Sequence, residues 1–206
     1  MEWQITDAQS LSLIDQEIGE HAFGPAKYEV IRRVILATGD YEYKELIHFS
    51  EQALLAGTAA LAARTVMVVD GLMVQAGLRA IASLTFANPV YCAREVPTRP
   101  SNAKSTVMRG VEALARRHPE AIFILSEQTT LSALQELVST GLIKPTLVIY
   151  TPASFIDSDC KDWLKVSGLP YICTRSSKGN AVVAVAITQV LIELAWQIYR
   201  SVEEHC

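Results

Sequence analysis

Charged and hydroxyl side chains follow directly after five short apolar runs of the chain. These polar segments are residues 70–71, 94–99, 126–130, 150–154 and 175–179. Together they supply three arginines, one lysine, several hydroxyl groups and one aspartate. Arginine binds carboxylates through two parallel hydrogen bonds, so this set suits a ligand that carries several carboxylates.

Two acidic positions leave their role open when the residues alone are considered. Asp40 and Glu42 flank Tyr41 just after a helical pattern, and they are either a solvated turn or a functional carboxylate pair. Asp70 ends an apolar run, where an aspartate serves as a catalytic carboxylate or as the N-cap of the next helix. The four histidines stand in polar or terminal contexts that suit ordinary structural roles.

Several classes of function are disfavoured by composition and by missing motifs. The formal net charge of −4 and the lack of a basic cluster disfavour nucleic-acid binding. The four cysteines are scattered without zinc spacing, so we expect no metal site and thiols in a reducing compartment. The polar N-terminus predicts no signal peptide and therefore a cytoplasmic protein.

The elements that must position the polar segments follow from hydrophobic periodicity. Short β-branched runs predict strands at residues 65–69, 89–92, 121–125, 146–150 and 171–174. Helical patterns occupy residues 6–19, 25–39, 51–63, 72–77, 102–117, 129–141 and 157–166, and a long one follows Gly179. Residues 181–199 are the strongest membrane candidate, but Gln189, Glu193 and Gln197 align on one face. That polar line indicates a core or interface helix and no membrane association.

Continuously apolar strands that alternate with helices predict an α/β fold with a mostly parallel sheet covered on both faces. We expect about five strands, a helical N-terminal region and a single domain over residues 1–206. Ligands of such sheets bind outside the carboxyl ends of the strands, which is where the polar segments lie.

Several short segments, and their order along the chain, resemble those of the precorrin-8X methylmutases. The residues in these segments are most similar to those of cyanobacterial members. Residues 37–43 (Ala-Thr-Gly-Asp-Tyr-Glu-Tyr) and residues 10–17 are similar to the family's Ala-Thr-Ala-Asp-Phe-Glu-Phe type and N-terminal segments. Further matches in the same order are Asp70 with Met73 and Gly77, Thr98-Arg99, residues 152–161 and Lys178-Gly179. The resemblance spans essentially the whole chain.

The resemblance implies a three-layer α/β/α homodimer that binds a tetrapyrrole near the subunit interface. It implies an isomerase of cobalamin biosynthesis, which moves a methyl group on ring C of precorrin-8X, or of its cobalt counterpart, without metal or organic cofactor. Carried onto this sequence, it predicts substrate contacts at these positions: Ser10, Thr38, Asp40, Asp70, Thr98, Arg99 and Lys178.

The chain departs from the family pattern at predicted ligand-facing positions. Leu36 stands where many members have a histidine assigned as the acid, and leucine cannot donate a proton. The Gly-Asn-Ala-Pro-Thr type loop is Ser-Glu-Gln-Thr-Thr at residues 126–130, and its Glu127 would repel a carboxylate-rich ligand if it pointed inward. Asn180 replaces a glycine, and residues 154–156 replace Gly-Phe-Val. An alternative is therefore a catalytically silent or repurposed protein that binds a tetrapyrrole such as a linear bilin.

Overall fold

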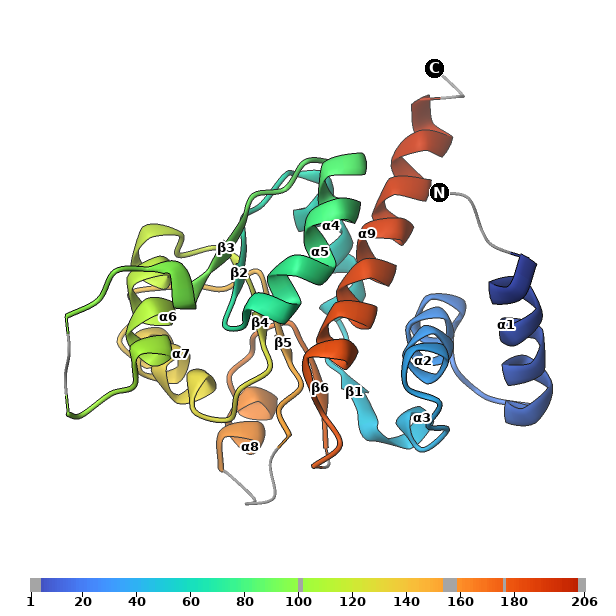
Figure 1. Ribbon diagram of the computed structural model, residues 1–206, viewed down its shortest axis with the longest axis horizontal. Helices are drawn as coiled ribbons and strands as arrows, with labels where there is room; N and C mark the ends of the chain where they lie inside the picture. Colours follow the sequence, from blue (N-terminus) through green and yellow to red (C-terminus); the bar gives the residue numbers. More distant parts are fainter. Residues whose placement is uncertain (1–4, 100–101, 154–158, 176, 204–206) are drawn as a thin grey trace.

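A twisted six-stranded sheet forms the centre of the protein in the computed structural model, which describes residues 5–99, 102–153, 159–175 and 177–203 (Figure 1). The strands are β1 (Ile47–Phe49), β2 (Met67–Val69), β3 (Val90–Cys92), β4 (Ile122–Leu125), β5 (Leu147–Tyr150) and β6 (Tyr171–Thr174). Their order is β1-β6-β5-β4-β2-β3, and all neighbours are parallel except β1, which runs antiparallel to β6. The predicted α/β class with a mostly parallel sheet is confirmed.

Helices cover both faces of this sheet. They are α1 (Ile5–Ile18), α2 (Pro25–Thr38), α3 (Tyr43–Leu46), α4 (Ala53–Ala62), α5 (Leu72–Leu84), α6 (Thr106–Arg117), α7 (Thr130–Ser139), α8 (Asp159–Val166) and α9 (Ala181–Glu203), with the short 3₁₀ helix η1 (Ala93–Glu95) after β3. All five predicted strands are present, and β1 is an additional edge strand that the sequence reading missed.

Alternating strand residues divide the core into two parts. Along β4, Ile122 and Ile124 pack with helices α2, α4, α5 and α9, whereas Phe123 and Leu125 pack with α6, α7 and α8. Successive side chains of a strand point to opposite faces, so a wholly apolar strand must be covered on both sides. The observed layers are therefore the α/β/α arrangement expected from the apolar runs.

Helix α9 is the central helix of one outer layer. It is long and apolar enough to cross a membrane, but 56% of its most apolar stretch is buried inside the protein. It packs against α2, α4 and α5 (Figure 1). Burial against three helices accounts for its composition, as the sequence analysis expected.

Candidate functional site

The carboxyl ends of the parallel strands meet along one edge of the sheet, the lower edge in Figure 1. Because β1 is antiparallel, Ile47 at its start pairs with Thr174 at the end of β6. The connection from α2 through α3 to β1 therefore reaches the same edge. This topology places the segment around Asp40 beside the segment around Lys178, although 138 residues separate the two.

Lys178 is held by two acidic side chains at this edge. Its ammonium donates to Asp40 Oδ2 at 2.7 Å and lies 2.9 Å from Glu42 Oε2. The hydrogen bond from Lys178 is the largest cause of a lowered pKa at Asp40, and the same pairing raises the pKa of Lys178. Asp40 is thus a carboxylate and Lys178 a cation near neutral pH.

Tyr43 holds the backbone of Lys178 in place. The side chain is buried, and its hydroxyl donates a hydrogen bond to the backbone carbonyl of Lys178. Burial raises the pKa of Tyr43, so its hydroxyl stays protonated as a donor. Tyr43 was not predicted as a site residue from the sequence, although it ends the segment of residues 37–43.

Gly179 and Asn180 determine how the chain passes from Lys178 into α9. A Cβ atom on Gly179 would lie 2.5 Å from the carbonyl oxygen of Pro152, so only glycine fits this close approach. The Asn180 side chain accepts a hydrogen bond from Val183 N at 3.1 Å and caps α9. Asparagine at this position therefore has a structural purpose.

A pocket of about 370 Å³ opens beside Lys178. Its lining residues are Ala37, Thr38, Asp40, Tyr43, Lys178, Asn180 and Val182. Thr38 ends α2, where its hydroxyl donates to Val34 O at 2.8 Å. The structure thus brings three predicted contact residues, Thr38, Asp40 and Lys178, into one open cavity.

Asp70 occupies a different environment at the same edge. It is fully buried, and its carboxylate accepts hydrogen bonds from Ser126 N, Glu127 N, Ser126 Oγ and Thr130 Oγ1 at 2.8 to 2.9 Å. Burial is the main cause of its raised pKa. Helix α5 is capped by Gly71 without a side-chain bond, so Asp70 is not an N-cap. It ties the end of β2 to the loop between β4 and α7.

The acidic side chain of the loop at residues 126–130 is paired with an arginine from a neighbouring segment. Glu127 forms an ion pair with Arg94, which lies in η1 after β3. The Glu127 side chain is therefore engaged by a cation, and the repulsion of an acidic ligand that the sequence raised is offset.

The remaining predicted contacts are dispersed. Leu36 is partly buried and packs against the core beneath α2. Ser10 lies on α1, which packs on the outer side of α2 in Figure 1, and its hydroxyl donates to Thr6 O at 2.8 Å. Thr98 and Arg99 follow η1 at the β3 side of the sheet; Arg99 is exposed, whereas Thr98 Oγ1 is buried without a hydrogen-bond partner. Residues 154–156 lie outside the described residues.

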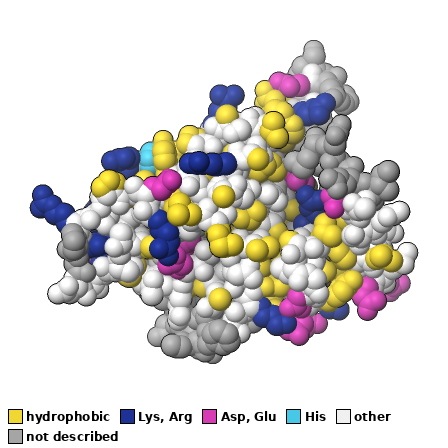
Figure 2. All heavy atoms as spheres, viewed as in Figure 1, with side chains coloured by type: hydrophobic (Ala, Val, Ile, Leu, Met, Phe, Trp, Pro, Cys, Tyr) yellow, Lys and Arg dark blue, Asp and Glu magenta, His cyan; other side chains and the backbone are white. Residues whose placement is uncertain are grey.

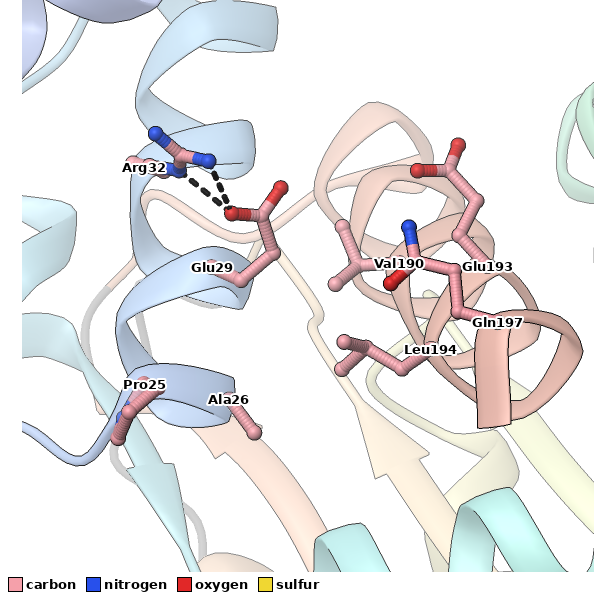
Figure 3. Close-up of a pocket in the computed structure, with 8 residues that line it drawn as sticks. All are labelled: Pro25, Ala26, Glu29, Arg32, Val190, Glu193, Leu194 and Gln197. Atoms are coloured by element: carbon pink, nitrogen blue, oxygen red, sulfur yellow. Dashed lines mark hydrogen bonds and ion pairs between the residues drawn. The ribbon is translucent and has the colours of Figure 1, made fainter. Parts of the chain in front are cut away.

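A second cavity of about 410 Å³ lies between α2 and α9 (Figure 3). Pro25 and Ala26 from the start of α2 line it, so it lies at the opposite end of that helix from Thr38. Glu29 and Glu193 also line it, and Arg32 is paired with Glu29 at 2.5 Å. Its position away from the strand ends separates this cavity from the candidate site.

Within the described ranges, no group of three or more His, Cys, Asp or Glu side chains is placed to hold a metal ion. At the strand edge the candidate site is instead an ammonium, a carboxylate pair and hydroxyl groups around an open pocket. Such a site can bind and orient an anionic or hydrogen-bonding ligand and stabilise charge on it.

Comparisons with known proteins agree with this geometry. The family model described as precorrin-8X methylmutase matches residues 5–194. A cobalt-precorrin-8 methylmutase of Synechocystis is 30% identical over 205 residues, which cover 92% of this chain and 94% of that protein. A precorrin-8X methylmutase of Pseudomonas aeruginosa is 32% identical, covering 81% of this chain and 84% of that protein.

A solved structure supports the same relation. The precorrin-8X methylmutase of Thermus thermophilus superposes with a TM-score of 0.82 at 33% identity, covering 93% of this chain and 98% of that one. The likeness extends over the sheet and both helical layers.

Proposed function

The chain belongs to the precorrin-8X methylmutase family, and on that premise we propose that it is the isomerase that moves a methyl group on ring C of precorrin-8X or cobalt-precorrin-8. The product is hydrogenobyrinate or its cobalt counterpart, within cobalamin biosynthesis. The observation that carries this proposal is the family match over residues 5–194, in a fold whose strand ends hold an open polar pocket.

The substrate chemistry suits the strand edge. A corrin precursor is a macrocycle with several carboxylate arms, and it needs cations and hydroxyl groups around its rim. Lys178 and Thr38 line the pocket at the edge where the strands end, and Arg99 is exposed on the chain that follows β3 and η1. We assign the open pocket beside Lys178 as the place where part of the macrocycle binds.

The chemical step requires orientation and polarisation of the ring. The bond from the methyl group to one ring carbon breaks while its bond to the neighbouring carbon forms, so the ring must be held still and its electrons polarised. Leu36 cannot do this. Lys178 is the cation nearest the pocket, and Asp40 and Glu42 fix its position. We assign Lys178 the role of stabilising charge on the ring, and Asp70 that of holding the neighbouring loop.

Turnover of the purified protein tests the function. Precorrin-8X and cobalt-precorrin-8 are supplied in parallel, and conversion is followed by absorption spectroscopy and by liquid chromatography. The product is an isomer, so its retention time changes while its mass does not. We expect conversion of at least one substrate. The variant Leu36→His restores the side chain that many members carry, and a general acid typically contributes about 10²–10⁴-fold. We expect it to raise kcat, and thermal unfolding checks the folding of the variant, because Leu36 is partly buried against the core.

The opposite result is equally readable. Tight binding of biliverdin, with neither corrin precursor bound or converted, would replace the isomerase by a bilin-binding protein on the same scaffold. Lys144→Met is a control for a general effect of substitution on these assays. Lys144 is exposed and lies outside the pocket, so this variant should behave as wild type.

We also propose that the protein is a cytoplasmic homodimer. Apolar side chains are exposed where α4 meets α9, including Leu55, Ile198 and Val202, around a groove of about 370 Å³. Exposed apolar grooves of this kind mark protein interfaces. Figure 2 shows further hydrophobic side chains exposed over α5 and α9. Light scattering of the purified protein should give twice the 22.6 kDa chain mass, and cell fractionation should find it in the soluble fraction.

A further inference from the structure

Arg109 on α6 carries a guanidinium group that is partly desolvated without a counter-ion. Its Nε and Nη1 atoms are buried and have no hydrogen-bond partner, and Nη2 reaches Thr106 Oγ1 only at 3.4 Å. The side chain as a whole is partly exposed, so part of it is open to a ligand. A buried donor left unpaired costs about 1–3 kcal/mol, and more when it is charged.

The position of Arg109 is set by close packing at the same strand edge. Ser105 caps α6 by accepting a hydrogen bond from Met108 N at 3.2 Å. The next residue, Gly110, lies against η1 so tightly that a Cβ atom there would be 2.0 Å from Ala93 O. The first turns of α6 are therefore fixed beside the end of β3.

The acidic side chains of the surrounding elements are bound to other partners. Glu95 accepts a hydrogen bond from Gln75 at 2.8 Å, and Glu127 pairs with Arg94. Glu112, on α6 itself, pairs with Lys104. The Asp70 carboxylate already accepts four hydrogen bonds from residues 126–130. Within the part of the chain that the structure describes, the charge on Arg109 is thus left uncompensated.

Two more features of this region indicate a missing anion. The start of a helix bears partial positive charge, yet the first turn of α6 has no acidic residue and Arg109 follows directly after it. Thr98, on the connection from η1 to α6, has a buried hydroxyl without a partner.

We propose that Arg109 binds a side-chain carboxylate of the tetrapyrrole substrate. The inference rests on the proposed function and extends its site across the sheet. The end of β3, beside which α6 begins, lies four strand steps from the end of β6, or about 19 Å. One macrocycle with extended carboxylate arms can span from the Lys178 pocket to Arg109. A bound carboxylate supplies the acceptor that the guanidinium lacks.

The test is a titration of wild type and Arg109→Met with hydrogenobyrinic acid, followed by absorption spectroscopy. Loss of a charge-assisted hydrogen bond predicts binding that is about 10- to 100-fold weaker in R109M. Arg116→Met is the matched control, because Arg116 is exposed on the last turn of the same helix, and its affinity should equal that of wild type.

Two further readouts separate ligand binding from a structural role. The fully esterified ligand has the same ring without negative charge, so wild type and R109M should bind it equally. Because Nε and Nη1 of the guanidinium have no partner and Nη2 has only the long bond to Thr106, R109M should have an unchanged or higher Tm in the absence of ligand. A lower Tm, or equal affinity of the two proteins for the acid, would overturn the assignment of Arg109. If wild type binds no corrinoid at all, the proposed function fails and this inference fails with it.

Discussion

Two carboxylates at the same edge of the sheet have opposite surroundings. Asp40 borders an open pocket and is paired with Lys178, whereas Asp70 is fully buried and bound only by neutral donors. The pairing lowers the pKa of Asp40, and burial raises that of Asp70. The difference teaches that a charged residue at a strand end has a role set by what surrounds it. Asp40 helps to present a cation to the pocket, and Asp70 holds a loop in place.

The largest expected effect is on stability, and it comes from removing the buried carboxylate of Asp70. Asp70→Ala leaves two backbone N–H groups and the Ser126 hydroxyl without their acceptor in a dry environment, whereas Thr130 Oγ1 can still donate to Glu127 O. We expect the free energy of unfolding to fall by about 3–5 kcal/mol, measured by urea denaturation. Asp162→Ala is the control, because the Asp162 side chain is 76% exposed and should cost almost nothing. A loss below 1 kcal/mol for Asp70→Ala would mean that the loop does not depend on this carboxylate.

Substitution of Lys178, which borders the open pocket, should affect activity and not folding. Lys178→Met removes the ammonium at the pocket but keeps an unbranched side chain, and we expect kcat to fall by about 10²-fold. Steady-state kinetics and thermal unfolding on the same preparations separate the two effects. If the variant lost stability as well as activity, with a clearly lower Tm, the lysine would be a structural residue like Asp70.

Acid sharpens the comparison because the two carboxylates have opposite linkage. Asp40 has a lowered pKa, so its stabilisation is present above its unfolded pKa of about 3.9 and is lost as the pH falls through its folded value. Asp70 has a raised pKa, so its contribution is full below about 3.9 and is lost as the pH rises through its folded value.

Thermal unfolding of wild type, Asp40→Asn and Asp70→Asn between pH 3 and 7 measures this directly. The Tm deficit of Asp40→Asn should shrink as the pH is lowered, and that of Asp70→Asn should grow. Parallel trends in the two variants would contradict the assigned environments.

The smallest effect is expected at Glu42, the second carboxylate on Lys178. Its side chain is 69% exposed, so Glu42→Gln should change the free energy of unfolding by at most about 0.5 kcal/mol. Urea denaturation in low and high salt checks this. A larger change, or one that salt does not weaken, would show that Glu42 and Asp40 hold the lysine equally.

Sequence patterns were sufficient for most of the fold but not for the edge strand. Most of the predicted strands are continuous apolar runs, and a run buried on both faces must be apolar throughout. The weaker run gave β3, whose Tyr91 is exposed. β1 has three residues, of which only Ile47 is buried. Its extended form depends on pairing with β6, which lies more than a hundred residues further along the chain. No local signal reports such a partner.

The sequence by itself determined which residue types stand at the strand ends, because strand periodicity and chain order are local properties. Only the tertiary structure decided what they do. It buried Asp70, placed Asp40 on Lys178 and left Ser10 on an outer helix. It also brought out Tyr43 and Arg109, which no spacing rule marks. Burial and counter-ions come from segments that are distant in the chain, and these determine whether a polar side chain is available to a ligand.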